Sequence, residues 1–414
     1  MLERNPLTSF YKKLKSYPPQ FRVLMAITFI DSVGGAVLFP FFSLYLTAKF
    51  GVGMTQVGLL FTGYAIGNII GSTLGGALTD ILGRKRVIVV ALIGSALGGL
   101  AMGFLDSYVL FLALSWIVGI LGGAGSPARQ AMVADLLPEE QRSEGFAMLR
   151  MLNNLAVTVG PAIGGLLAAR SYLLLFVSDA VMSLIAAVVI ILVMKETMPA
   201  TSQEEEAKSV GTAMGGYKHV LRDSPFILFI GACALTALAS MQINSTLSVY
   251  LRDSHGVSTQ GFGYILSLNA AMVVLFQFAI TNALSRYPRF LIMAAGTLLY
   301  GIGLSMYGFV SAYVLFLVAM ATLTVGEMMF WPTAQSMAAT FEPEDMRGRY
   351  MATFGYTHAL TMMVGPLLAG LLMDNADPRW LWYVSGLLGL VGAVVFLRLR
   401  RRVEQRTASS TVAA

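Results

Sequence analysis

Apolar runs separated by short polar segments occupy most of the chain, and twelve of them are long enough to cross a bilayer as helices. One polar connection, residues 195–224, is much longer than the others and falls halfway along the chain. The pattern predicts an all-α integral membrane protein with two six-helix bundles at 22–194 and 225–399, an N-terminal segment at 1–21, a connecting loop at 195–224 and a tail at 400–414. The expected spans lie near residues 22–47, 55–79, 87–105, 108–134, 143–169, 172–194, 225–251, 258–284, 289–309, 312–338, 347–373 and 379–399.

An internal repeat supports the division into two halves. The stretch from Pro127 to Leu167 returns 205 positions later, from Pro332 to Leu372, and 15 of its 41 positions are identical without a gap. The identical positions include prolines, a charge cluster and a Gly-Pro step, which shared apolar composition alone does not align. We therefore expect two structural repeats of about 200 residues each.

Composition defines the class of protein. Hydrophobic residues make up 56% of the chain, charged residues make up 12%, and the mean hydropathy is +0.72. Because a soluble protein carries about 25% charged residues, a lipid bilayer must be the solvent for much of this chain. One cysteine, three scattered histidines and the absence of a nucleotide-binding loop, metal cluster or catalytic triad argue against an enzyme, a metal site or a cofactor.

The placement of positive charge predicts the topology. If both termini are cytoplasmic, 22 of the 28 lysines and arginines fall on the cytoplasmic side and four fall in exterior loops. This asymmetry is typical of membrane proteins, whose cytoplasmic loops are enriched in lysine and arginine, and it explains the net charge of +6 without nucleic acid as a partner. We expect a multi-pass protein of a bacterial inner membrane, acting as a monomer.

The loop after the second span carries the motif that suggests a family. From Gly76 to Arg86 it reads GALTDILGRKR, which resembles the G-x-L-x-D-x-x-G-R-K/R signature of major facilitator superfamily transporters. With twelve spans and the repeat, the resemblance covers essentially the whole chain and implies the fold of that superfamily. It also implies a cytoplasmic gate of Asp80, Gly83, Arg84 and Asp135, in which Asp80 caps the start of span 11 and Arg84 engages Asp135. In the alternative interpretation, the basic residues of the motif only set the topology.

A second element favours export. Gly160, Pro161, Gly164 and Gly165 in span 5 resemble the G-P-x-x-G-G element of antiporters and exporters in the same superfamily. Proline removes a backbone hydrogen bond and bends the helix, while the glycines allow close packing. The arginine that drug–proton antiporters often carry in span 4 is missing here, because Ser115 stands in its place. This departure weakens the usual scheme for proton coupling.

Few ionisable groups fall within the spans, and each is costly if it faces lipid. Asp31 and Glu327 lie near the middle of spans 1 and 10, and Asp179 lies nearer the outer end of span 6. Such a carboxyl group can bind a proton in one state and release it in another. We expect Glu327 to carry the coupling proton, ahead of Asp31 and then Asp179. The alternative is that each acid pairs permanently with an arginine or a hydroxyl group.

Four further polar residues are candidates for a cavity lining: Arg129, Arg150, Asn154 and His358. The two arginines either bind an anionic headgroup or substrate, or pair with Asp135 and the loop acids, and we favour the second alternative. In span 2, glycines recur every four residues from Gly63 to Gly75, as a close-packing stripe or a sliding surface.

The sequence therefore predicts a secondary active transporter that exports lipophilic or cationic small molecules in exchange for protons by alternating access. One alternative within the same fold is a dedicated exporter of one metabolite or lipid. A non-transporting membrane sensor is the third interpretation, and the gate motif and the midplane acids argue against it.

Overall fold

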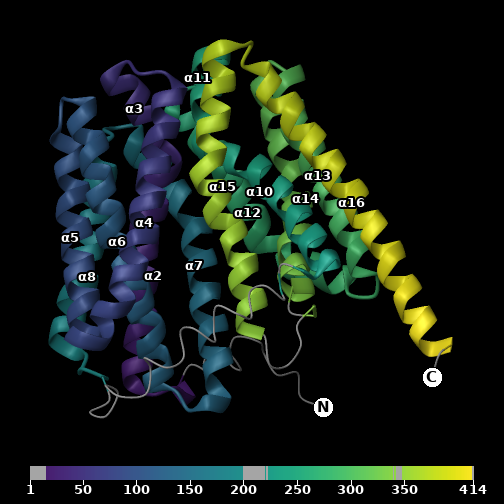
Figure 1. Cartoon of the computed structure of the whole chain (residues 1–414). Helices are drawn as coiled ribbons and strands as arrows, with labels where there is room; N and C mark the ends of the chain where they lie inside the picture. The colour runs from purple at the N-terminus through teal and green to yellow at the C-terminus, as the bar shows by residue number, and fades with distance from the viewer. Residues whose placement is uncertain (1–14, 199–219, 221, 339, 342–346, 413–414) are drawn as a thin grey trace, which may run out of the picture. The chain divides into compact units, whose positions relative to one another are not determined.

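A computed structural model describes residues 15–198, 220, 222–338, 340–341 and 347–412, and the regular elements within those ranges are all helices (Figure 1). Within the same ranges, twelve helices are long and apolar enough to cross a membrane. The prediction of an all-helical protein with twelve spans is confirmed. The candidate span Arg379–Arg401 is close to the predicted 379–399, and the helix that contains it, α16, continues from Arg379 to Val412. The residues after 399 are polar, but none is a proline or a glycine that would end a helix.

The chain divides into two compact units. The first comprises Met1–Phe39 and Gly63–Glu204, and the second comprises Pro40–Thr62 and Glu205–Ala414. The first unit contains α2 (Pro19–Leu38), most of α4 (Met54–Leu82), α5 (Arg84–Phe104), α6 (Tyr108–Leu136), α7 (Glu139–Ala168) and α8 (Leu173–Val193). The second contains the short elements η1 (Phe39–Phe41, except its first residue) and α3 (Phe42–Phe50), the start of α4, α10 (Ser224–Ser245), α11 (Leu247–His255), α12 (Thr259–Leu284), α13 (Arg289–Phe309), α14 (Tyr313–Ala338), α15 (Arg347–Asn375) and α16.

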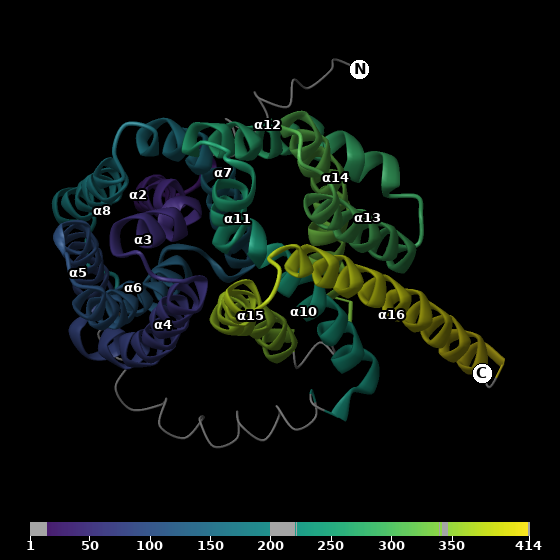
Figure 2. The same ribbon diagram turned by 90° about the horizontal axis from the view of Figure 1, so that it is seen from above.

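The sequence repeat reappears as a repeated packing pattern. In the first unit, α2 packs on α7 and α8, while α5 packs on α6 and α8. In the second unit, α10 packs on α15 and α16, while α13 packs on α14 and α16, so that each pair of the first unit has its counterpart. Figure 2 shows α2, α5, α6 and α8 nearly end-on as one cluster of helices.

The repeat extends to the breaks within spans 1 and 7. The offset of 205 residues maps Phe41, where η1 separates α2 from α3, onto Thr246, where α10 gives way to α11. The same offset maps Gly51 onto Gly256, which end α3 and α11 with φ values of 62° and 65°. This left-handed backbone favours glycine, so both broken helices end in the same way. Discontinuous helices of this kind are a recurring feature of transporters.

The glycine stripe in α4 is a close packing surface within the first unit. A Cβ atom at Gly67, Gly71 or Gly75 would meet the backbone carbonyl oxygens of α6, at Trp116, Ile120 and Ala124 respectively. In return, α6 places its own glycines 119 and 123 against the backbone of α4. Both helices therefore lack side chains along the seam, and their backbones approach directly. Of the two alternatives from the sequence, the structure shows the packing role.

Candidate functional site

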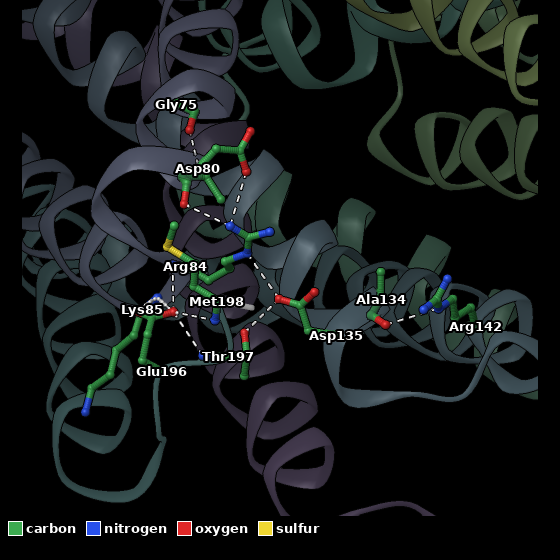
Figure 3. A network of polar contacts seen from close by, with 11 residues as sticks. Gly75, Asp80, Arg84, Lys85, Ala134, Asp135, Arg142, Glu196, Thr197 and Met198 are labelled. Carbon is green, nitrogen blue, oxygen red and sulfur yellow. Dashed lines mark hydrogen bonds and ion pairs between the residues drawn. The ribbon is translucent and has the colours of Figure 1, made fainter. Parts of the chain in front are cut away.

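The turn between α4 and α5 holds the first polar network (Figure 3). Gly83 has φ of 92°, a conformation that favours glycine, and this sharp turn directs Arg84 back across the end of α4. The Arg84 guanidinium group donates from Nε to Asp135 Oδ2 at 3.1 Å and from a terminal nitrogen to Asp80 Oδ1 at 3.2 Å. The same terminal nitrogen donates to the Thr79 carbonyl oxygen at 3.2 Å. The structure thus joins the four residues of the predicted gate, whereas the residues just before α15, which Asp80 was expected to cap, lie outside the described part of the chain.

Glu196 extends this network, and sequence reasoning did not identify it. Its carboxylate accepts the backbone N–H groups of Arg84 at 2.9 Å and Lys85 at 3.1 Å, and so caps the start of α5 (Figure 3). Thr197 donates its hydroxyl to Asp135 Oδ2 at 3.0 Å. The Lys85 ammonium group donates to the carbonyl oxygens at 191 and 194, at the end of α8. The beginning of the connecting loop is therefore bonded to the gate motif, and an acid directly after span 6 was the available signal.

The second polar network lies in the middle of the first unit. Asp31 on α2 pairs with Arg129 on α6 at 2.7 Å and accepts a hydrogen bond from the Ser183 hydroxyl on α8 at 2.8 Å. The two charged side chains are 19% and 23% exposed, so the pair is shielded but not sealed from water. The expected pairing of Arg129 with Asp135 is wrong, because Arg129 pairs with Asp31 while Asp135 pairs with Arg84. Residues six positions apart on α6 project from different sides of the helix.

Asp179 on α8 lies one turn before Ser183. A Cβ atom at Gly34 on α2 would lie 2.9 Å from its Oδ1 atom, and one at Gly99 on α5 would lie 3.6 Å from Oδ2. A larger residue at position 34 would therefore collide with Asp179, whereas the distance at position 99 is an ordinary van der Waals contact. Among the described residues, no side chain or backbone group forms a hydrogen bond or an ion pair with it. Asp31 and Asp179 are thus neighbours in different environments.

Glu327 on α14 is the acid at the centre of the second unit. Its Oε2 atom accepts a hydrogen bond from the Asn269 amide on α12 at 2.8 Å, and that amide also donates to the Thr324 hydroxyl at 2.9 Å. Tyr300 on α13, which is 2% exposed, interacts with Glu327 electrostatically. No arginine, lysine or histidine among the described residues pairs with Glu327. The Asn269 amide, which the Thr324 hydroxyl holds in place, orients this carboxyl group and brings no charge to it.

The remaining candidates are more dispersed. Gly160 packs against Ala36 of α2, and Pro161, Gly164 and Gly165 are buried beside it, so the glycine–proline element lies on the seam between α7 and α2. Arg150 and Asn154 are exposed on α7, away from the Asp31 pair. The side chain of His358 lies outside the described part of the structure.

The second unit contains a helix cap that the sequence did not suggest. Asp374, near the end of α15, accepts the backbone N–H groups of Met54 at 2.9 Å and Thr55 at 2.7 Å. These groups belong to the first turn of α4, where a helix has unpaired donors and a positive dipole end. The start of span 2 is thereby bonded to the end of span 11.

Comparisons with known proteins agree with the geometry. The family model described as Major Facilitator Superfamily matches residues 24–258 and 230–413. The chain is 26% identical to the Na(+), Li(+), K(+)/H(+) antiporter of Planococcus maritimus, over 96% of this chain and 100% of the relative. It is 23% identical to the quinolone resistance protein NorA of Staphylococcus aureus strain MSSA476, over 91% of this chain and 96% of NorA. Among solved structures, a D-xylose–proton symporter shares the fold with a TM-score of 0.70 at 16% identity, over 91% of this chain and 96% of the symporter.

Proposed function

From the premise that this chain belongs to the major facilitator superfamily, we propose that it exports lipophilic or cationic small molecules in exchange for protons. Membership makes the chain a secondary transporter and not an enzyme. The proposal concerns the direction of transport, the coupling ion and the substrate class. We propose further that the protein acts as a monomer in the inner membrane of a bacterium, with both termini in the cytoplasm, as the distribution of lysine and arginine indicates.

The observation that carries the proposal is the environment of Glu327. It is an acid in the middle of a membrane-spanning helix, held by an amide and without a basic partner among the described residues. An unpaired carboxylate is costly in such a place, whereas the neutral acid is not, so the site favours proton binding whenever water withdraws. Access of water from one side then allows the proton to leave. This is the behaviour that an exchanger needs from its coupling residue.

The relatives support exchange. One relative, which this chain matches over 100% of its length, is described as an antiporter of alkali cations and protons, and another as a quinolone resistance protein. The first description favours a second candidate function, exchange of an alkali cation for protons. Both functions use a carboxyl group that binds a proton or a cation in turn, so substrate tests must separate them.

In the proposed cycle, two halves rock about a central substrate site. The network of Asp80, Arg84 and Asp135 is the cytoplasmic gate in this scheme. The Asp80 side chain is 48% exposed while Arg84 is 9% exposed, so the carboxylate is accessible to a new partner without unpacking the arginine. Since Arg84 keeps Asp135 as a second anionic partner, the Asp80 contact is the one that can break at low cost.

Proton movement in inside-out vesicles tests the proposal. Energised vesicles that contain the protein should release protons when members of a panel of lipophilic cations are added. Glu327→Gln should abolish this release while the protein remains folded, because the amide keeps the shape and the hydrogen-bonding capacity but binds no proton. Glu140→Gln, at an exposed acid in the first turn of α7, is the matched control.

Two results contradict the proposal in different ways. Normal substrate-evoked proton release by the Glu327→Gln variant would refute the coupling role of Glu327. Release evoked by sodium, lithium or potassium, and by none of the lipophilic cations, would replace drug export with alkali-cation exchange.

A further inference from the structure

The first unit contains a carboxyl group that the coupling role of Glu327 leaves unexplained. Asp179 projects from α8 towards α2 and α5. One of its oxygen atoms faces Gly34 of α2 and the other faces Gly99 of α5. It has no hydrogen-bond or ion-pair partner among the described residues. Asp31 lies one turn before Gly34 on α2 and has two partners. These are the Arg129 guanidinium group and the hydroxyl group of Ser183, which lies one turn after Asp179 on α8.

Asp179 is half-buried within a membrane-spanning helix, and an ionised carboxylate in this position has no counter-ion or hydrogen-bond donor among the described residues. Transferring a charge from water into such surroundings is strongly unfavourable unless a counter-ion or several donors accompany it. Arg129, the basic residue of the adjoining network, forms its ion pair with Asp31 at 2.7 Å. A proton is therefore the simplest ligand that satisfies Asp179 in this structure, since it removes the charge and needs no further space.

The groups that face Asp179 explain how it can release that proton. Asp31 on α2 and Tyr64 on α4 interact with it electrostatically, Gly99 of α5 contributes no charge, and Arg129 of α6 is paired with Asp31. On α8 itself, Asp179 is the one ionisable residue. If Asp179 loses its proton, two carboxylates compete for one guanidinium group, and a small movement of Arg129 redistributes its hydrogen bonds between them.

We propose that Asp179 is a second proton-binding site, which takes up and releases one proton independently of Glu327. The two sites lie in different halves of the repeat, and the repeat does not duplicate either acid, because Asp179 maps onto Val384 and Glu327 maps onto Gly122. The use of this site in transport rests on the proposed exchange function, whereas proton binding itself does not. The Asp31–Arg129 ion pair is the electrostatic neighbour of the site.

Infrared difference spectroscopy of the purified, lipid-reconstituted protein tests proton binding directly, without any substrate. A protonated carboxylic acid has a C=O stretching band that disappears when the group ionises. As the pH is raised over the range in which the reconstituted protein stays folded, we expect the wild type to lose such bands from both sites. Asp179→Asn should remove one band and keep the other, and Glu327→Gln should do the reverse. If Asp179→Asn leaves the spectrum unchanged while the protein is folded, Asp179 does not bind a proton and the proposal is wrong.

A second measurement needs no variant. Hydrophobic carbodiimides react with protonated carboxyl groups in apolar surroundings, and mass spectrometry of peptides locates the adduct. We expect an adduct at Asp179 that decreases as the pH rises, and none at Asp31, whose carboxylate is paired. An adduct at Asp31 with none at Asp179 would overturn the assignment. Neither measurement depends on a transported compound, so silence of the drug panel with a clear Asp179 signal would refute the proposed function and leave this inference intact.

Discussion

Replacing Arg129 by glutamine tests whether Asp31 serves as the partner of a structural ion pair or as a residue that binds the coupling proton. The change removes the positive charge from a contact of 2.7 Å and leaves Asp31 with the Ser183 hydroxyl as its remaining partner. Breaking a buried ion pair from one side costs about 3–5 kcal/mol because the other charge stays behind. Since the two side chains here are 23% and 19% exposed, we expect the lower end of that range, about 3 kcal/mol.

Protonation of Asp31 sets an upper limit to the stability that the Arg129→Gln variant can lose. Protonating an aspartate that is ionised in water costs about 4 kcal/mol at pH 7, so the variant cannot lose much more than that before Asp31 binds a proton instead. The same reasoning predicts that the destabilisation decreases as the pH falls. For a unit of this size, a loss of about 3 kcal/mol corresponds to a decrease of about 6–12 °C in melting temperature.

The assay is a double-mutant cycle in detergent or lipid. Thermal unfolding is measured for wild type, Arg129→Gln, Asp31→Asn and the double variant, at neutral and at acidic pH. The double variant should be more stable than Arg129→Gln, because two neutral amides leave no uncompensated charge, and the coupling energy should be about 2 kcal/mol. Additive losses with no pH dependence would refute the assignment of Asp31 and Arg129 as an ion pair.

Three further changes test other contacts of the structure. Glu196→Ala should cost about 1 kcal/mol and speed hydrogen exchange in the first turn of α5, whereas Glu196→Gln, which keeps an acceptor oxygen, should lose less. Asp374→Ala should cost about 1–2 kcal/mol in thermal unfolding because two N–H groups of α4 lose their acceptor, and an unchanged melting temperature would contradict the cap. Burial and then the charge of Arg379 lower the pKa of His255, so its stabilising contribution is complete above the unfolded value and decreases as the pH falls through the folded one. Melting curves near pH 7 and near pH 5 should therefore differ more for wild type than for His255→Gln, and equal differences would refute this shift.

The positions of the spans could be predicted from the sequence because their signal is local. An apolar run of sufficient length must form a helix in lipid, where no water satisfies the backbone. The breaks in spans 1 and 7 had local signals that the division into apolar runs overlooked, because Pro40 stands in η1 and the polar residues 244–246 stand where α10 ends. Only the comparison of the two repeats makes their equivalence visible.

Some contacts of the candidate site could be predicted from the sequence, and others could not. The proximity of Arg84 and Asp135 followed from the resemblance to a family, not from the residues themselves, and the structure shows the contact. The pairing of Arg129 with Asp31 was missed because it depends on the rotation of α2 and α6 about their axes, which a run of apolar residues does not specify. Glu196 was missed because it stands at the start of a polar connection, where an acid looks like an ordinary solvated residue.

Substrate accumulation driven by an imposed pH gradient tests the central claim, proton exchange through Glu327, most directly. Proteoliposomes with purified protein are loaded with acidic buffer and diluted into alkaline medium that contains a radiolabelled lipophilic cation identified by the vesicle panel. The account predicts accumulation above the equilibrium concentration by the wild type. It also predicts that Glu327→Gln only equilibrates the compound, because transport continues while its coupling to protons is lost. Accumulation by Glu327→Gln equal to that of the wild type would contradict the account.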